Sequence, residues 1–361
     1  MTDLCFAYGS NTNLAAWRNW CLDRGYDPNC IEPVGPARMP DMSLVFNYYS
    51  PGWDGGALNV RRRIGGFIDG LLFRASPRGW AALDAKEGVR GGYYERVPRT
   101  VVLPDGEATA AIVYEVCVPR RAGFVRPAEA YLDIVRQGFA EQGFDTAPLE
   151  AAAQGGDGCH VLADVFAYGT LMRDELRHGC AEALGLHSVT PAETFGHLYD
   201  LGEYPALSLG SPAAAVKGKL LRFKEIERAL TGLDAIEDAR SGCAPGGLYR
   251  RTIITATGQA DQPVSAWAYV METAQVADLP MIKAGIGVTA LHPEQSNRET
   301  RARRRDMPGW QWLFAKQPLP PNNALDELFA RRLCIGNRCS DSARARPAPA
   351  SHAFLRLCSL F

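Results

Sequence analysis

Histidine is absent from the first 150 residues of this chain, since all six histidines lie at position 160 or later. This absence excludes mechanisms that pair a serine or cysteine nucleophile with histidine from that part of the protein. The ten cysteines form no Cys-x-x-Cys pair, and Cys334 and Cys339 have no second pair or histidine at zinc spacing. We therefore expect reduced thiols and no bound metal.

Long apolar runs and a basic amino-terminal segment are also missing, which argues against a transmembrane helix and against an ordinary secretory signal. The 39 basic and 40 acidic residues give a net charge of −1, which argues against nucleic acid or an anionic membrane as a partner. The arginine-rich runs at 61–63 and 301–305 have no adjacent aromatic platform. We expect a cytoplasmic protein without a nucleic-acid or membrane partner, and the sequence leaves its oligomeric state open.

Four blocks of the first half of the chain recur in the second half in the same order. Residues 4–10 (LCFAYGS) recur as 165–170 (VFAYGT), 83–87 (LDAKE) as 233–237 (LDAIE), 91–96 (GGYYER) as 246–251 (GGLYRR), and 111–114 (AIVY) as 266–269 (AWAY). Self-similarity in one order is the signature of a duplicated unit. The sequence therefore predicts two homologous domains with insertions and deletions between them.

A stretch rich in glycine, residues 154–158 (QGGDG), separates the two repeats and indicates a flexible linker. We expect a first domain at 1–150, a linker at 151–160, a second domain at 161–275 and a tail at 276–361. Residues 291–361 carry 12 basic and 6 acidic residues, several prolines and weak periodicity. We expect this basic tail to be largely irregular, with short helical pieces around 323–334.

Each repeat mixes short β-type runs with a few helices. The β-type runs of the first repeat lie at 4–8, 43–46, 57–60, 66–73, 96–103 and 109–116. Helices are expected at 13–24, with Asn11 or Asn13 as the cap, at 77–87, ended by Gly88, and at 127–142. This pattern predicts an α+β fold in which each domain has a curled sheet or a small barrel.

The strand-to-helix turn at residues 6–11 (FAYGSN) is the first candidate for chemistry. Such a turn leaves backbone N–H groups unpaired at the start of a helix, where an anion or an oxyanion can bind. Gly9 allows a tight turn and a close approach of a ligand. An ordinary capped turn has the same pattern, and its recurrence at 168–172 (YGTLM) fits both interpretations.

Glu87 is the second candidate, because it ends an amphipathic helix directly before Gly88. The helix dipole favours cations at that end, so a carboxylate there is in electrostatic conflict, which hints at a role other than stability. Glu237 has the same position in the second repeat. The alternative is a solvated glutamate at a fraying helix end.

These motifs resemble the gamma-glutamylcyclotransferase-like family. Residues 53–57 (WDGGA) resemble its Trp-x-Gly-Gly turn, and 83–89 (LDAKEGV) are similar to the segment that carries the catalytic acid/base. The resemblance implies that Glu87 is this acid/base. It also implies that Tyr8, Gly9, Ser10 and Asn11 form the substrate-binding loop, and that Tyr131 is a substrate-contacting residue of the glutathione-degradation branch.

The second repeat resembles the gamma-glutamylamine-cyclotransferase-like branch at 168–171, 204–207, 216–220 and 233–237. This resemblance implies that Glu237 is catalytic and that Tyr168, Gly169, Thr170 and Leu171 bind substrate. The repeat departs from the pattern at two points. Thr170-Leu171 stands where the first repeat has Ser10-Asn11, and 238–240 (DAR) replaces the glycine that usually follows the glutamate.

The family fold implied is a small mixed β-barrel flanked by helices in each of two tandem domains. The activity implied is cyclisation of gamma-glutamyl amino acids or amines to 5-oxoproline, with release of the free amino acid or amine and without a cofactor or metal. The alternative is a catalytically silent ligand-binding or scaffold protein of the same fold. A pure binder does not need a glutamate at the same position of both repeats, so we favour catalysis.

Overall fold

The computed structural model describes residues 3–168, 181–201, 205–210, 213–258 and 261–282. The part of the expected tail from residue 283 onward therefore lies outside the described residues. We call residues 3–161 the first copy and residues 164–282 the second copy. Both belong to one compact unit of the chain. None of the described helices is long and apolar enough to span a membrane.

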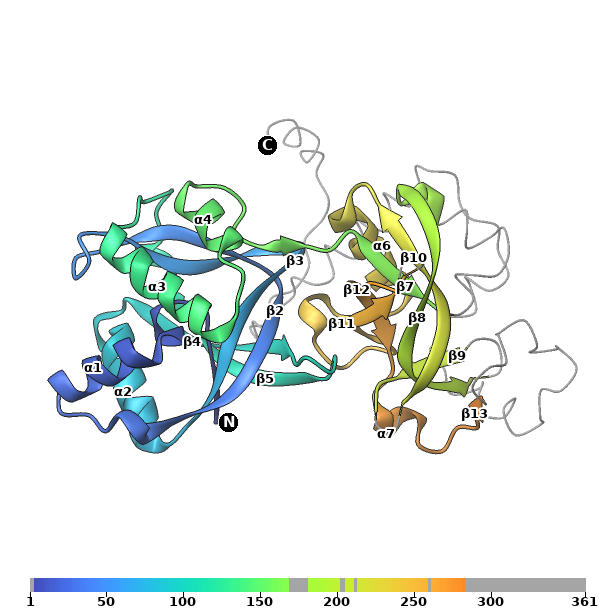
Figure 1. Cartoon of the computed structure of the whole chain (residues 1–361), viewed down its shortest axis with the longest axis horizontal. Coiled ribbons are helices and arrows are strands. Elements are labelled where there is room, and N and C mark those ends of the chain that lie inside the picture. Colours follow the sequence, from blue (N-terminus) through green and yellow to red (C-terminus); the bar gives the residue numbers. More distant parts are fainter. Residues whose placement is uncertain (1–2, 169–180, 202–204, 211–212, 259–260, 283–361) are drawn as a thin grey trace, which may run out of the picture. The chain divides into compact units, whose positions relative to one another are not determined.

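Five strands of the first copy close into a mixed β-barrel (Figure 1). They are β1 (Leu4–Ala7), β2 (Ile31–Ser50), β3 (Gly55–Ala75), β4 (Tyr94–Val102) and β5 (Ala108–Val116). Their order is β1-β5-β4-β2-β3, and β3 pairs back to β1 to close the barrel. Only the β1–β5 pair of this barrel is parallel, and short turns join the antiparallel neighbours β2 to β3 and β4 to β5.

The second copy repeats this topology. Its barrel strands are β7 (Asp164–Ala167), β8 (Leu186–Asp200), β10 (Ala214–Phe223), β11 (Arg250–Thr257) and β12 (Pro263–Val270). Their order is β7-β12-β11-β8-β10, β10 pairs back to β7, and β7 is parallel to β12. Short strands β9 (Pro205–Ser208) and β13 (Met281–Ile282) add to β8. The predicted α+β fold with two tandem mixed barrels is confirmed.

Strand length is where the sequence prediction is wrong. The runs at 57–60 and 66–73 were expected as separate strands, yet both lie inside β3, and the run at 43–46 is the middle of β2. Register shifts interrupt the β2–β3 ladder at three points, between Pro33 and Gly35, Pro40 and Met42, and Phe46 and Tyr48. A bulge bends a strand without ending its pairing, so residues that normally end a strand are tolerated there.

Three helices of the first copy begin and end close to the expected positions: α1 (Leu14–Asp23), α2 (Pro77–Glu87) and α3 (Glu129–Gln142). A fourth helix, α4 (Ala147–Ala153), was not predicted from the sequence. The Asn13 side chain caps α1 by accepting a hydrogen bond from Ala16 N–H at 2.8 Å. Ser76 caps α2 in the same way, and Gly88 ends it in the left-handed conformation with φ +65°.

Several shorter elements complete the described residues. They are the 3₁₀ helices η1 (Ser10–Thr12), η2 (Pro28–Cys30), η3 (Val89–Gly91), η4 (Val118–Arg120) and η6 (Ser241–Cys243), the helices α6 (Ile226–Ile236) and α7 (Thr273–Val276), and strand β6 (His160–Val161). At the end of the expected linker, Gly158 binds β2 through Leu44 N–H, which donates to Gly158 O at 2.8 Å. Strand β6 then pairs with β3, so residues 158–161 are hydrogen-bonded to the first barrel.

Candidate active site

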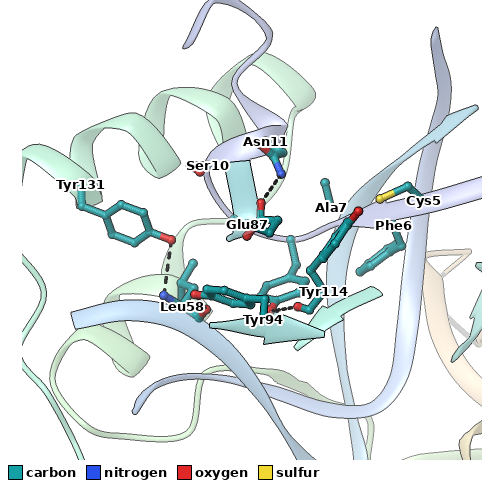
Figure 2. A pocket seen from close by; sticks show the side chains of 12 residues that line it. Cys5, Phe6, Ala7, Ser10, Asn11, Leu58, Glu87, Tyr94, Tyr114 and Tyr131 are labelled. Atoms are coloured by element: carbon teal, nitrogen blue, oxygen red, sulfur yellow. Dashed lines mark hydrogen bonds between the residues drawn. The ribbon is translucent and has the colours of Figure 1, made fainter. Parts of the chain in front are cut away.

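A cavity of about 40 Å³ lies where β1 leaves the first barrel. All six site residues that the sequence predicts for the first copy line it: Tyr8, Gly9, Ser10, Asn11, Glu87 and Tyr131. Figure 2 shows the Glu87 carboxylate between the loop that carries Asn11 and a layer of tyrosine rings. The fold therefore brings together residues that are up to 123 positions apart.

The loop of the site is fixed by close packing against α3. After β1 the chain turns at Gly9 into η1, where Thr12 N–H and the Thr12 hydroxyl both donate to Gly9 O. Gly138 of α3 faces this turn, and a Cβ there would lie 2.4 Å from Thr12 Oγ1. Only a glycine lets the helix approach so closely, so Gly138 supports the loop from behind.

The Trp-x-Gly-Gly turn holds the other side of the site. Gly56 N–H donates to Arg126 O at 2.8 Å, and a Cβ on Gly56 would lie 2.1 Å from Val125 O. This contact fixes the chain just before α3, the helix that carries Tyr131. The ring of Trp53 packs against the Tyr131 ring at 5.3 Å. The turn thus positions Tyr131 for the cavity.

Glu87 is the last residue of α2 and is held in one position. Asn11 Nδ2 donates to Glu87 Oε1 at 2.7 Å, and the side chain is half-buried. Burial raises the pKa of the Glu87 carboxyl, while the Lys86 charge and the Asn11 hydrogen bond lower it, and the net change is upward. A carboxyl with a raised pKa in a cavity is suited to proton transfer. The interpretation of Glu87 as a solvated residue at a frayed helix end is wrong.

Asn11 has a second polar atom in the site. Its Oδ1 is buried and has no hydrogen-bond partner among the residues that the structure describes. A buried acceptor without a partner costs about 1–3 kcal/mol, and such atoms in a functional site often await a ligand. Because Nδ2 is committed to Glu87, Oδ1 is an acceptor for a donor that enters the cavity.

The tyrosines of the cavity keep neutral hydroxyl groups that form hydrogen bonds. Burial is the largest cause of the raised pKa of Tyr8, Tyr94 and Tyr131. The Tyr8 hydroxyl donates to Tyr114 O at 2.6 Å, and the Tyr94 hydroxyl donates to Leu58 O at 2.7 Å. The Tyr131 hydroxyl accepts from Leu58 N–H at 3.3 Å, so its own hydrogen can be donated into the cavity.

Sequence reasoning missed two groups that support the site. Lys86 Nζ donates to Ser10 Oγ at 3.0 Å, which places a cation beside the loop. The sequence held one signal for it, since Lys86 is the only lysine before residue 217. Asp84 accepts two hydrogen bonds from Arg96, at 2.7 and 2.8 Å, and one from the Tyr114 hydroxyl at 2.7 Å. These bonds join the last turn of α2 to β4 and β5.

The second copy repeats this support. The Tyr168 hydroxyl donates to Tyr269 O at 2.6 Å, and the Tyr269 hydroxyl donates to Asp234 at 2.8 Å. Arg251 Nε lies 3.1 Å from Asp234 Oδ1. Glu237 directly follows α6, and its N–H donates to Leu233 O at 2.8 Å. Gly169, Thr170 and Leu171 lie outside the described residues.

Two differences distinguish the second copy. Asp238 replaces the glycine that follows the glutamate, yet it has φ +48°, in the same left-handed region as Gly88. Aspartate adopts this region more easily than most residues, so the backbone turn after the glutamate is kept. Ile236 stands where the first copy has Lys86, and its side chain is exposed. The second copy therefore carries an apolar group at this position.

Among the described residues, no group of three or more His, Cys, Asp or Glu side chains is placed to hold a metal ion. Six described cysteines are free thiols. Cys5 lines the cavity, but burial is the largest cause of the raised pKa of its thiol, which therefore stays protonated. Glu87 is the carboxyl group among the residues that line this cavity, and burial raises its pKa.

Comparison with known proteins shows the same duplication. The profile described as "Gamma-glutamyl cyclotransferase, AIG2-like" matches residues 5–132 and 165–286, well over half of the chain. The comparison with curated proteins finds no match. Among solved structures, a "Gamma-glutamyl cyclotransferase" is 23% identical, with 42% of this chain and 84% of that chain covered and a TM-score of 0.35.

Two further solved structures are similar to this chain. YkqA from Bacillus subtilis is 15% identical, with 75% of this chain and 84% of that chain covered and a TM-score of 0.30. An AIG2-like protein from Mus musculus is 21% identical, with 35% of this chain and 88% of that chain covered and a TM-score of 0.25. Since the family profile matches both copies, the chain belongs to the gamma-glutamyl cyclotransferase, AIG2-like family as a tandem duplication.

Proposed function

We propose that the protein cyclises gamma-glutamyl amino acids or amines to 5-oxoproline and releases the free amino acid or amine. Glu87 is the general acid/base of the first copy, and Glu237 has this role in the second. The observation that carries the proposal is the Glu87 carboxyl itself. It is half-buried, has a raised pKa, is fixed by Asn11 and lines a cavity with the predicted loop.

The reaction needs one proton carrier because the nucleophile is part of the substrate. The α-amine of the gamma-glutamyl group attacks its own γ-carbonyl carbon, a C–N bond of the five-membered ring forms, and the γ-amide C–N bond breaks. Glu87 takes a proton from the α-ammonium and passes a proton to the leaving nitrogen. Holding the amine and the carbonyl in a near-attack geometry contributes roughly 7–11 kcal/mol to such a reaction.

The groups around Glu87 match the charges of a gamma-glutamyl head group. Asn11 Oδ1, buried and without a partner among the described residues, accepts a hydrogen bond from the α-ammonium beside Glu87. The Lys86 cation next to Ser10 favours the α-carboxylate at the loop. The Tyr131 hydroxyl donates to the γ-carbonyl oxygen as negative charge develops there, and one such donor is worth about 2.7–4 kcal/mol.

The two copies are expected to act on different leaving groups. Lys86 gives the first site a positive charge, whereas Ile236 makes the corresponding position of the second copy apolar. The sequence also has the apolar Leu171 in the second copy where the first copy has the polar Asn11. We propose that the second site accepts less charged or bulkier amines than the first.

The test is 5-oxoproline release by the full chain from a panel of gamma-glutamyl amino acids and gamma-glutamyl amines. Glu87→Gln should lower the rate about 100- to 10,000-fold for one group of substrates, because the isosteric amide can neither take nor give a proton in the reaction. Glu237→Gln should act on a different group, and the double variant should lose both. Near-normal turnover by Glu87→Gln on every substrate would contradict the assignment of the first site.

A second copy without catalytic activity would give a different result in the same experiment. If Glu237→Gln changes no substrate while Glu87→Gln abolishes all turnover, the second copy is a structural or binding domain. The left-handed turn at Asp238 and the shared support of Asp234 favour an active second site over this outcome.

A further inference from the structure

In both copies an arginine faces the aspartate that lies three residues before the glutamate, but the arginine has different partners in the two copies. In the first copy, Arg96 is partly exposed and binds both oxygens of Asp84. In the second copy the Arg251 side chain is fully buried, and its Nε and Nη1 have no well-aligned hydrogen-bond partner among the described residues. Its Nη2 donates to Asp41, a residue of the first copy.

Asp41 lies on β2 at the bulge between Pro40 and Met42, and it is buried. Its φ of +57° is in the left-handed region, a strained conformation that persists only where surrounding contacts fix it. Its Oδ1 accepts from Gly65 N–H of the first copy at 3.0 Å. Its Oδ2 accepts from Gly242 N–H of the second copy at 2.7 Å and from Arg251.

The contacts of Asp41 and Arg251 enclose the segment that contains Glu237. At one end of this segment, Asp234 faces Arg251 and accepts the Tyr269 hydroxyl. At the other end, Gly242 donates its N–H to Asp41. Inside it, Ala239 N–H donates to Asp234 O at 2.8 Å. The first residue of segment 234–242 therefore faces Arg251, and the last is hydrogen-bonded to Asp41. Both ends of the segment are held by the same buried ion pair.

We propose that Asp41 is a positioning residue for the second copy, so that the first copy supplies the carboxylate that holds residues 234–242, and with them Glu237, in place. This inference rests on the proposed function for the catalytic role of Glu237. Removing one partner of a buried ion pair is strongly destabilising because the other charge stays buried without compensation. Loss of Asp41 would also take the acceptor from Gly242 N–H.

The first copy does not need this help from its neighbour. Arg96 makes two short hydrogen bonds to Asp84 and stacks on the Trp80 ring at 4.4 Å. All three residues belong to the first copy. The dependence therefore runs in one direction, and a change at Asp41 should affect the second site much more than the first.

The test is Asp41→Asn in the full chain, read by hydrogen–deuterium exchange of peptides over 234–242 and over 84–92. Loss of a charge-assisted hydrogen bond should speed exchange of 234–242 by about tenfold or more, with 84–92 unchanged. In the Glu87→Gln background, kcat of the Glu237-dependent reaction should fall about 10- to 100-fold while KM changes little. In the Glu237→Gln background, kcat of the Glu87-dependent reaction should be retained.

Two further variants complete the experiment. Glu227→Gln is the matched control, since Glu227 also pairs with an arginine of the first copy, Arg63 at 3.1 Å, but on the exposed surface. Glu227→Gln should leave the hydrogen–deuterium exchange of both peptides, 234–242 and 84–92, unchanged. Arg251→Lys keeps the positive charge but loses the planar guanidinium with its several donors. It should speed the exchange of 234–242 as Asp41→Asn does. Thermal melting followed by circular dichroism checks that each variant is folded.

The outcomes separate the two proposals. Unchanged exchange of 234–242 in a folded Asp41→Asn or Arg251→Lys variant would overturn the positioning role, as would equal acceleration of 84–92. Faster exchange confined to 234–242, in a protein with no Glu237-dependent turnover on any substrate, would support the link between the copies and end the catalytic proposal for the second copy.

Discussion

Replacing Asn11 by leucine removes the hydrogen bond that holds the Glu87 carboxylate. Leucine has the same branched outline as asparagine, and it stands at the corresponding position of the second copy, Leu171. The change deletes the 2.7 Å bond from Nδ2 to Glu87 Oε1 and the buried acceptor Oδ1 together. Both losses fall on the step in which Glu87 takes a proton from the substrate.

The size of the effect follows from the charged acceptor. A hydrogen bond to an ionised group is worth about 1.5–3 kcal/mol. Since every 1.36 kcal/mol is tenfold in rate, kcat/KM should fall about 10- to 150-fold. The bond also lowers the pKa of Glu87, so its loss raises that pKa further. The acid limb of the pH profile of kcat/KM should therefore move to higher pH.

The assay is 5-oxoproline release across pH by Asn11→Leu in the Glu237→Gln background, which leaves the first site alone. Asn29→Leu is the matched control, because it makes the same substitution at an exposed position of η2 and should leave the profile unchanged. A profile of Asn11→Leu that superimposes on that of its background would refute the reasoning that the Asn11 bond tunes Glu87.

Two more predictions concern packing and pH. Gly138→Val would force Cβ against Thr12 Oγ1, so α3 should move from the loop, with a loss of about 1–3 kcal/mol in a urea melt and weaker substrate binding by the first site. Burial raises the pKa of Asp234 from its ordinary 3.8 to about 6, so the folded protein binds this proton more tightly than the unfolded chain. Stability should therefore fall as pH rises from 4 to 6, and urea melts of Asp234→Asn should lack this component.

Local signals in the sequence explain how much of the site was predictable. Glu87 stood out because a carboxylate at a helix end conflicts with the dipole, and Gly88 marked the end of that helix. The repeated blocks predicted two copies of one domain, which the strand order confirms. The same local reading failed for β2 and β3, because a bulge that bends a strand looks in sequence like the end of one.

The sequence alone determined the duplication, the fold class, the position of most helices of the first copy and six of the residues of the first copy that line the cavity. The tertiary structure decided what those residues do to one another. Asn11 meets Glu87 across 76 positions, and Asp41 meets Arg251 across 210. Capping and periodicity act over a few residues along the chain, whereas these contacts depend on the register of closed barrels and on which groups become buried together. No local pattern contains that information, so the pairing of Asp41 with the second copy emerged only from the folded chain.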